Sequence, residues 1–481
     1  MALDYAKLGL KSGIEIHQQL SSHKLFCDCD SQMAQQSNDE IVRKMRAVAG
    51  ELGDVDAAAL HEVLQNKEFH YMTYPEETCL VETDSEPPHE MNRDALEIGL
   101  KIALMLNCEI PDEIHVMRKQ VVDGSNTSGF QRTAIIGMNG WIKTSFGKVG
   151  ITNISVEEDA CQIIEKNNKK VVYGLHRLGI PLVEIGTSPD MRLPEQVKEA
   201  SEKLGMILRS TGRVRRGLGT IRQDVNVSIK NGTRIELKGV QDLDMIPKHV
   251  DDEIIRQQGF IKKKESVPKE VRRVTDNGSE FMRPLTGGAR MYPETDIPPI
   301  SIDRNYLSQL KKELPELWDA REKRFMKQYG LAKDTVKQLN RMDKAYIFED
   351  IVKKGHDAKL VANTLTAGLT QLKRKENINI ENLHEKQFEI VFDAFKSGKL
   401  IKDAILTALK QLAENPDAEI GEGKVSDEAE LRGKIRDIIK KNPKAKDAPR
   451  PEQAYMGLVM KELRGKADGK MVMKILKEEL K

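Results

Sequence analysis

The stretch GIEIHQQL, residues 13–20, decides the fold because its apolar and polar residues alternate. In a β-strand this alternation places Ile14 and Ile16 on one face and Glu15 and His17 on the other. The pattern therefore predicts a half-buried strand whose second face carries a carboxylate beside an imidazole. Two interpretations stay open for that pair: metal ligands or acid/base groups in a cleft, or an ion pair on an exposed sheet face.

The order of strand-like and helical segments indicates the fold class. Residues 120–156 are typical of strands separated by turns, whereas residues 91–107 have the apolar spacing of a helix. After residue 300 the sequence is helical, with Gly and Pro between the helices. This order predicts an α+β protein with a large mixed α/β domain over residues 1–300. Two all-helical domains are expected to follow, over residues 301–411 and 412–481.

Length and charge limit the classes of protein to which the chain can belong. Its 481 residues suffice for about three domains, and its charged residues nearly cancel to a net charge of +2. Any surface for a polyanion must therefore be local. Because no run of 18 apolar residues occurs and residues 1–13 lack the apolar core of a signal peptide, we expect a cytoplasmic protein with no membrane partner.

Charge is unevenly distributed in the last domain. Residues 411–431 carry a net charge of −6 and residues 432–481 a net charge of +8. Apolar residues in the basic segment recur at helical spacing and predict a packed core with cations facing outward. These cations form either a solvated surface or contacts to nucleic-acid phosphates. The candidates are Lys461, Arg464, Lys466, Lys470 and Lys474.

Further carboxylates accompany Glu15 and His17 in strand-like segments. Glu157 and Glu158 end the apolar run of residues 147–156, and Glu184 lies inside another apolar run. A buried carboxylate requires a cation, and oxygen ligands from several segments suit Mg²⁺ that holds a nucleotide's phosphates. Each cluster alone is typical of a surface. Together they make a metal–phosphate site an equal alternative.

A glycine-containing loop follows a basic pair. Arg118 and Lys119 can reach phosphate, and the loop of residues 124–129, which includes Ser125 and Asn126, can present backbone N–H groups to an anion. Loops of this composition are also ordinary turns. The chain contains no P-loop motif, so an ATP site would be of another kind.

Three cysteines have the spacing of part of a zinc site. Cys27 and Cys29 form a C-x-C pair, and Cys79 follows later in the chain. Structural zinc is usually held by four ligands. The fourth is not evident, with His70 and His89 as candidates, so the alternative that no zinc is bound stays open.

Seven stretches in order along the chain carry a family resemblance: GLKSGIEIHQQLSSHKLFCDC (9–29), MRKQVVDGSNTSGFQRT (117–133), ISVEEDA (154–160), HRLGIPLVEIGTSPD (176–190), RRGLGTIRQDVNVSI (215–229), RIELKGVQDLDMIP (234–247) and RMYPETDIPP (290–299). They resemble the E-subunit family of the archaeal glutamyl-tRNA(Gln) amidotransferases and, more loosely, the bacterial and organellar B subunits. Residues 454–476 resemble the family's tRNA-binding C-terminal domain.

The resemblance implies a reaction in two steps. ATP and Mg²⁺ convert the γ-carboxylate of glutamate mischarged on tRNA(Gln) into a γ-glutamyl phosphate, and ammonia then displaces the phosphate. The implied partners are an asparaginase-like D subunit, which supplies ammonia, and tRNA(Gln) charged with Glu. The first domain would be the catalytic cradle, and the helical domain and basic tail would hold the tRNA.

The resemblance also implies roles for residues. Five align with the family's metal-binding acidic site: Glu15, His17, Glu157, Glu158 and Glu184, with Glu157 and Glu184 expected as direct ligands. Lys119 matches an active-site lysine near the expected entry of ammonia. Six more are expected to line the same cleft: Arg177, Asp224, Asn226, Lys238, Tyr292 and Glu294. Among all of these, Glu157, Lys119 and Arg177 are expected to be catalytic.

One departure concerns a domain that larger E subunits carry before the RMYPETDIPP motif. Here residues 269–296 cross that position directly, as in B subunits. Two alternatives to an E subunit follow: a B-type subunit that also accepts aspartyl-tRNA(Asn), and a non-catalytic tRNA-binding protein. The dense carboxylates oppose the second alternative, because a binder of polyanions gains nothing from negative charge in its cleft.

Overall fold

The computed structural model describes residues 3–46, 53, 55, 60, 63–121, 123–285, 291–416, 418, 428–447, 451–463 and 469–480. The chain divides into two compact units, Met1–Leu317 and Trp318–Lys481. Within the described part of the chain, no helix is long and apolar enough to cross a membrane.

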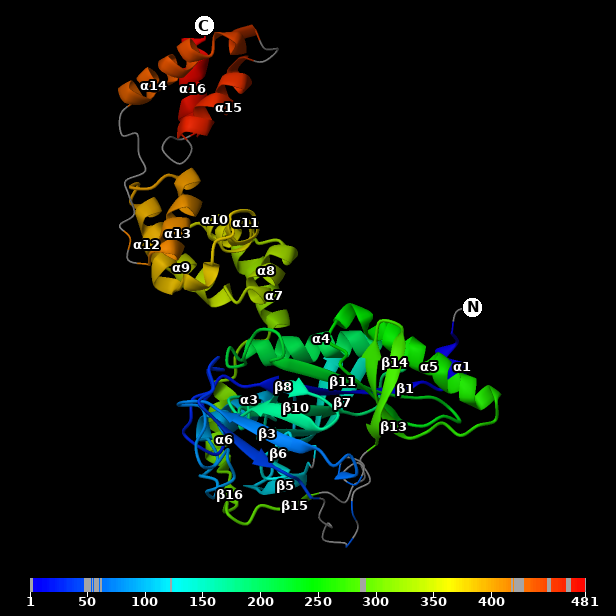
Figure 1. Cartoon of the computed structure of the whole chain (residues 1–481). Helices are drawn as coiled ribbons and strands as arrows, with labels where there is room; N and C mark the ends of the chain where they lie inside the picture. The colour runs from blue at the N-terminus through cyan, green and yellow to red at the C-terminus, as the bar shows by residue number, and fades with distance from the viewer. Residues whose placement is uncertain are drawn as a thin grey trace. The chain divides into compact units, whose positions relative to one another are not determined.

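A ten-stranded sheet forms the centre of the first unit (Figure 1), with the strand order β14-β13-β12-β11-β1-β10-β7-β6-β5-β15. Its strands are β1 (Lys11–Gln19), β5 (Val116–Gln120), β6 (Phe130–Thr144), β7 (Gly147–Glu158), β10 (Pro181–Thr187), β11 (Ile221–Ser228), β12 (Ile235–Lys238), β13 (Glu270–Thr275), β14 (Gly278–Pro284) and β15 (Met291–Pro293). Neighbouring strands are antiparallel except β12 and β13, which run parallel.

One face of this sheet is apolar and covered by helices. Ile14 and Ile16 of β1 are each 1% exposed, which confirms the alternation predicted for residues 13–20. They share one core with apolar residues of three helices: α3 (Arg93–Met105), α4 (Pro194–Ser210) and α5 (Ile246–Lys262). Burial of this face leaves the second face of the same strands to polar side chains.

Strand pairing fixes which polar residues meet on the second face. His17 on β1 lies opposite Glu184 on β10. Glu157 on β7 lies opposite Leu182, two residues before Glu184 and therefore on the same face. A slip of one residue would turn every side chain to the other face. The apolar core on one side of the sheet therefore sets the positions of the polar residues on the other.

A smaller sheet has the order β2-β3-β9-β8. Its strands are β2 (Asp39–Arg43), β3 (Glu68–Thr73), β8 (Gln162–Lys166) and β9 (Lys170–Gly174). Tyr71 and Tyr173 from this sheet donate hydrogen bonds to the backbone carbonyls of Gly124 and Asp123. The small sheet thereby holds the start of the glycine-containing loop in place.

Further short elements of the first unit include α1 (Tyr5–Leu8), β4 (Glu113–Ile114), β16 (Ile300–Ser301) and α6 (Arg304–Lys312). Strand β16 pairs with β4. Leu307 and Leu310 of α6 are buried in the main core, so this helix packs on the first unit.

The second unit is helical, and its described residues form two separate apolar cores. Helices α7 (Trp318–Tyr329), α8 (Lys333–Arg341), α9 (Ala345–Lys353), α10 (Ala358–Asn363), α11 (Leu369–Lys375), α12 (Glu385–Lys396) and α13 (Ile405–Glu414) surround the first core. Helices α14 (Glu428–Lys441), α15 (Pro451–Leu463) and α16 (Gly469–Glu479) surround the second. Val459, Val472, Ile475 and Leu476 are buried there, which confirms the predicted apolar stripe. The predicted α+β fold class is confirmed as well.

Candidate functional site

Five charged side chains from four strands meet on the polar face of the large sheet. They are Lys119 (β5), Glu157 (β7), Glu184 (β10), and Glu15 and His17 (β1), and we call them the acidic cluster. His17 Nε2 lies 3.2 Å from Glu184 Oε2, 3.6 Å from Glu15 Oε1 and 3.8 Å from Glu157 Oε1. Lys119 Nζ lies 2.7 Å from Glu157 Oε2 and 3.5 Å from Glu184 Oε2.

Shielding from water perturbs the carboxylates of the acidic cluster. Burial, and then the charge of Glu184, raise the pKa of Glu15 to about 7. Burial also raises the pKa of Glu157, against the opposing charge of Lys119. Burial opposes ionisation of Glu184 too, but the hydrogen bond from His17 and the charge of Lys119 outweigh it and lower its pKa. The cluster thus lacks enough positive charge for all its carboxylates.

The donors of the acidic cluster fit a hard divalent cation. One ligand atom each from Glu15, His17 and Glu184 lie within 4.8 Å of one another. Carboxylate oxygens with one imidazole leave coordination positions for water or phosphate, which is how Mg²⁺ is usually bound at nucleotide sites. A cation here would also offset the burial and the repulsion from Glu184 that raise the pKa of Glu15.

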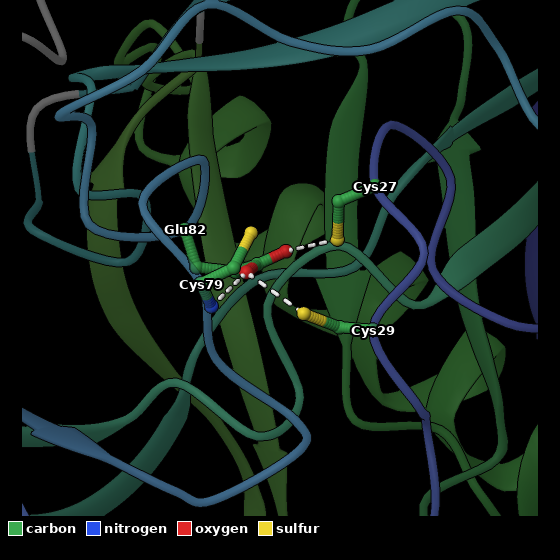
Figure 2. A group of neighbouring side chains, drawn as sticks. All are labelled: Cys27, Cys29, Cys79 and Glu82. Carbon is green, nitrogen blue, oxygen red and sulfur yellow. Dashed lines mark hydrogen bonds between the residues drawn. The ribbon is translucent and has the colours of Figure 1, made fainter.

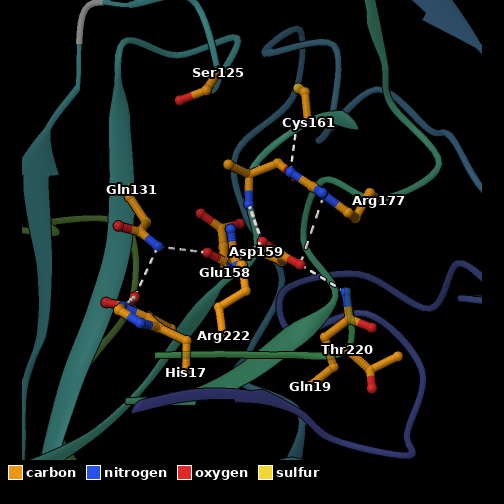
Figure 3. Close-up of polar contacts among 12 residues, drawn as sticks. His17, Gln19, Ser125, Gln131, Glu158, Asp159, Cys161, Arg177, Thr220 and Arg222 are labelled. Carbon is orange, nitrogen blue, oxygen red and sulfur yellow. Dashed lines mark hydrogen bonds and ion pairs between the residues drawn. The ribbon is translucent and has the colours of Figure 1, made fainter. Parts of the chain in front are cut away.

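Gln131 of β6 fixes the orientation of Glu157. Its Nε2 donates to Glu157 Oε1 at 3.0 Å. The same Nε2 donates to the backbone carbonyl of Glu158 at 2.7 Å (Figure 3). Lys119 holds the other oxygen of Glu157. Gln131 was not predicted from the sequence, because an amide side chain in a strand does not by itself indicate a site. Its role becomes evident only from the strand pairing, which places it opposite Lys119.

Asp224 extends the polar face beyond the acidic cluster, since it lies opposite Glu15 in the pairing of β1 with β11. Lys238 Nζ lies 2.6 Å from Asp224 Oδ2 and 2.8 Å from Glu236 Oε1. Burial opposes the charge of Lys238, but the two carboxylates outweigh it and raise the pKa of Lys238. Asn226 lies two residues further along β11. These residues flank the cluster without contacting His17 in the described structure.

Glu158 faces away from the acidic cluster. Consecutive residues of β7 point to opposite faces, so Glu158 meets Arg132, whose backbone N donates to it at 3.1 Å and whose Nη1 lies 3.4 Å away. Arg132 Nε also donates to Glu294 at 2.8 Å, and Glu294 pairs with Arg118. The structure therefore places Glu158 in a buried ion-pair network and does not bring it to the other expected metal ligands.

Phe130 lies at the centre of this network. The guanidinium carbons of Arg118 and Arg132 lie 4.6 and 5.1 Å from its ring centroid, and the ring of Tyr292 packs edge-on at 6.3 Å. Arg118 is the neighbour of Lys119 in β5, and Glu158 is the neighbour of Glu157 in β7. The side chains of Arg118 and Glu158 therefore point to the face opposite the acidic cluster. Arg118 was expected to reach phosphate, and Tyr292 and Glu294 were expected in the cleft. The structure collects all three away from the acidic cluster.

Asp159 anchors the segment that follows Glu158 (Figure 3). It is 1% exposed and accepts hydrogen bonds from Gln19 Nε2 at 2.7 Å and Arg222 Nη2 at 2.8 Å, with Arg177 Nε at 3.7 Å. Arg177 also donates to the backbone carbonyls of the two residues after Asp159, at 2.7 and 2.8 Å. Arg177 therefore supports this segment and does not touch the cluster itself.

The expected anion-binding loop is held by internal contacts. The backbone N and hydroxyl of Ser125 donate to Asp123 Oδ1 at 2.9 and 2.6 Å. Asn126 is 2% exposed, and its Nδ2 has no hydrogen-bond partner within the described structure. Thr127 donates to the backbone carbonyl of Glu82 at 2.6 Å, which links the loop to a second group of side chains.

That second group consists of Cys27, Cys29, Cys79 and Glu82 (Figure 2), whose ligand atoms all lie within 4.8 Å of one another. Cys27 Sγ lies 2.8 Å from Glu82 Oε1, and Cys29 Sγ lies 3.8 Å from Glu82 Oε2. The backbone N of Cys79 donates to Glu82 Oε2 at 2.8 Å. Burial raises the pKa of Glu82. We call these four residues the cysteine group.

Glu82 occupies the place for which two histidines were candidates. His70 contacts Glu40 at 2.7 Å and His89 contacts Glu86 at 3.6 Å instead. The signal for Glu82 was present as the C-x-x-E spacing that begins at Cys79. It was overlooked because only cysteine and histidine were considered as the fourth ligand.

The basic tail is described in part. Lys461 and Lys474 are exposed, while Arg464 and Lys466 lie outside the described residues, as does the side chain of Lys470. Arg432 pairs with both Glu478 and Glu479 at 2.6 and 3.0 Å. Among the candidates that the structure describes, Lys461 and Lys474 thus present their charge at the surface.

Comparisons with known proteins agree with the family resemblance. Residues 10–308 match the family described as the GatB/GatE catalytic domain, and residues 346–480 match the GatB domain. The glutamyl-tRNA(Gln) amidotransferase E subunit of Methanocaldococcus jannaschii is 37% identical over 630 aligned positions, with 100% of each chain covered. That of Archaeoglobus fulgidus is 36% identical over 616 positions, covering 100% of this chain and 99% of the relative.

The aligned lengths exceed the 481 residues of this chain. The relatives therefore carry sequence that it lacks, in keeping with the missing inserted domain. The acidic cluster and the cysteine group both lie inside the matched catalytic domain. The chain belongs to the GatB/GatE family, and within it to the glutamyl-tRNA(Gln) amidotransferase E subunits.

Proposed function

We propose that this chain is the subunit of a tRNA-dependent amidotransferase that activates a carboxylate with ATP and then amidates it. The observation that carries the proposal is the acidic cluster, where three carboxylates, an imidazole and an ammonium group converge inside the catalytic domain. The substrate is glutamate esterified to tRNA(Gln), and the product is glutaminyl-tRNA(Gln).

The first step creates a leaving group. A γ-carboxylate oxygen of the substrate attacks the γ-phosphorus of ATP, and ADP leaves. Without this step the leaving group of an amidation would be oxide. Glu15, His17 and Glu184 would hold Mg²⁺, which offsets charge on the triphosphate. Lys119 adds a fixed positive charge beside the transferred group.

The second step replaces phosphate with nitrogen. Ammonia attacks the γ-carbonyl carbon, and phosphate leaves with the electrons of the carbon–oxygen bond. A base must take one proton from the nitrogen. Glu157 is suited to this, since burial raises its pKa and Gln131 and Lys119 fix both of its oxygens.

A partner subunit supplies the ammonia in this proposal. The partner we favour is an asparaginase-like D subunit, because the relatives in the comparison are E subunits. The alternative is a B-type arrangement with an amidase-type partner. Co-purification distinguishes the two, since an asparaginase-like companion supports the first and an amidase-signature companion the second.

Glu157→Gln is expected to lower glutamine formation by at least about 100-fold, because the amide neither accepts a proton nor holds Lys119 by charge. Affinity for tRNA should stay nearly unchanged. The assay supplies ATP, Mg²⁺, ammonium and Glu-tRNA(Gln) to the purified chain and measures glutamine on the tRNA. Filter binding measures the tRNA affinity.

Glu158→Gln is the matched control. It makes the same chemical change at the next residue of β7, whose side chain points to the opposite face of the sheet. It should weaken the pair with Arg132 and lower the thermal stability, while the activity of the folded protein stays near that of the wild type. Full activity in Glu157→Gln would remove this residue from the mechanism.

We further propose that the cysteine group holds Zn²⁺. Three thiolates and one carboxylate provide the four ligands that close a structural zinc site. The ion would tie residues 27–29 to residues 79–82 and, through Thr127, steady the loop that leads to Gln131.

The chain purified under reducing conditions should contain about one zinc ion per molecule, measured by mass spectrometry of the metal. Cys29→Ser should lose this zinc and melt at a lower temperature, because a structural metal contributes folding free energy. Cys108 lies outside the group, so the variant Cys108→Ser should keep the metal. Zinc-free wild-type protein from a zinc-supplemented culture would contradict the assignment.

We also propose that the helical domain and the basic tail hold the tRNA. The net charge of the tail and the exposure of Lys461 and Lys474 support this. Deletion of the residues after Asp427 should weaken tRNA binding and flatten its dependence on salt, because fewer counterions are released. An unchanged salt slope would show that these lysines are only a solvated surface.

A further inference from the structure

Arg222 of β11 lies beside the acidic cluster and has no role in the steps above. In the pairing of β1 with β11 it is directly opposite His17, and residues opposite each other in antiparallel strands point to the same face. Val225 and Val227 of β11 are buried in the apolar core, so the alternation of the strand also assigns Arg222 to the polar face. The sheet therefore places a guanidinium group next to the imidazole that is proposed to bind the metal.

The Arg222 side chain runs across the polar face. Its Nη2 lies 2.8 Å from Oδ1 of Asp159 (Figure 3), a residue that follows β7, and β1 and β10 separate β11 from β7. Gln19 at the end of β1 donates to the other oxygen of Asp159 at 2.7 Å. Asp159 therefore draws the guanidinium group across β1, the strand that carries Glu15 and His17.

Positive charge exceeds negative charge around Asp159. Within the described residues, this one carboxylate is the ion-pair partner of both Arg222 and Arg177. Arg177 also donates to the backbone carbonyls of Ala160 and Cys161. In the described structure Arg222 makes no second contact of this kind, and its side chain is 37% exposed. The remaining N–H groups of Arg222 are thus open to an anion.

The position of Arg222 indicates which anion this is. The strands β11 and β5, which carry Arg222 and Lys119, lie on opposite sides of the three strands that carry the carboxylates of the acidic cluster. Lys119 already pairs with Glu157 and Glu184. During phosphoryl transfer, negative charge is spread over three oxygens of the transferred group, and the planar guanidinium fork can hold two of them. Arg222 is therefore suited to the phosphoryl group beside the metal site.

We propose that Arg222 is a catalytic residue that contacts the γ-phosphoryl group as this group passes from ATP to the glutamate carboxylate, and that Asp159 positions it. The bond between the γ-phosphorus and the bridging oxygen breaks, and its electrons stay on ADP. A carboxylate oxygen forms the new bond to phosphorus. Arg222 keeps all its protons and offsets the charge on the oxygens of the transferred group.

This inference rests on the proposed function and deepens its first step. The arginine that was expected to be catalytic is Arg177, whose Nε and Nη2 are occupied by backbone carbonyls. The inference gives the catalytic role to Arg222 and leaves Arg177 as a support for the segment after β7.

The test compares Arg222→Ala with Arg213→Ala. Arg213 is a matched control, because it also pairs with an aspartate, Asp94, at 2.7 Å, and its side chain is 49% exposed. With ATP, Mg²⁺, ammonium and Glu-tRNA, Arg222→Ala should lower the kcat of ADP formation and of glutamine formation about 100-fold or more, the loss typical of a group that stabilises charge in a transition state. The KM for Glu-tRNA should change little, and Arg213→Ala should behave as the wild type.

Added guanidinium distinguishes a lost charge from a lost structural contact. At a concentration far below that which unfolds the protein, it should restore part of the ADP formation of Arg222→Ala. Urea has the same shape without the charge and should not. An unchanged kcat in Arg222→Ala would overturn the inference, and so would a rise in the KM for Glu-tRNA with an unchanged kcat. A loss of activity that guanidinium does not restore, in a variant that also melts at a lower temperature, would assign Arg222 to structural support and overturn it as well.

A binding measurement tests the contact without turnover. Aluminium fluoride together with ADP and Mg²⁺ mimics the phosphoryl group in transfer and should tighten the binding of ADP to the wild type. Arg222→Ala should bind ADP alone as the wild type does and lose at least about tenfold of the tightening, the loss typical of one charge-assisted hydrogen bond. Equal tightening in both proteins, with wild-type turnover intact, would contradict this inference alone. A wild-type chain that forms neither ADP nor glutamine from Glu-tRNA would contradict the proposed function and this inference with it.

Discussion

One constraint underlies the rest of the structure. A single face of the large sheet brings carboxylates together where they are shielded from water, and these carboxylates repel one another. Glu15, Glu157 and Glu184 share a site in which His17 and Lys119 are the cations paired with them among the described residues. Burial, together with this repulsion, raises the pKa of Glu15 to about 7. A protein gains no stability from such a group by itself. Its persistence is explained if a divalent cation and the phosphates of a nucleotide complete it.

The apolar core makes this placement possible. Ile14 and Ile16 are anchored beneath the sheet, so Glu15 and His17 have only the other face available. The same rule separates Lys119 from Arg118 and Glu157 from Glu158. One set forms the acidic cluster and the other a closed network of ion pairs around Phe130. The proposed chemistry and the structural support thus lie on opposite faces of the same strands.

Much of the site could be predicted from the sequence where the signal was local. Alternation around Ile14 and Ile16 predicted the strand and the face shared by Glu15 and His17, and long motifs indicated the family. Gln131 and Glu82 were missed, because their roles depend on strands and loops that are distant in sequence. Membership of a family motif also did not reveal on which face Arg118 or Glu294 lies. That information depends on strand pairing, which a single sequence does not contain.

Metal binding by the isolated chain tests the central claim most directly. Electron paramagnetic resonance can follow Mn²⁺ added in place of Mg²⁺ without nucleotide. We predict one bound Mn²⁺ that Mg²⁺ displaces, with an affinity that falls at least about tenfold in Glu184→Gln, the loss typical of a perturbed metal site. Equal Mn²⁺ affinity in the wild type and Glu184→Gln, or no binding by the wild type, would contradict the account.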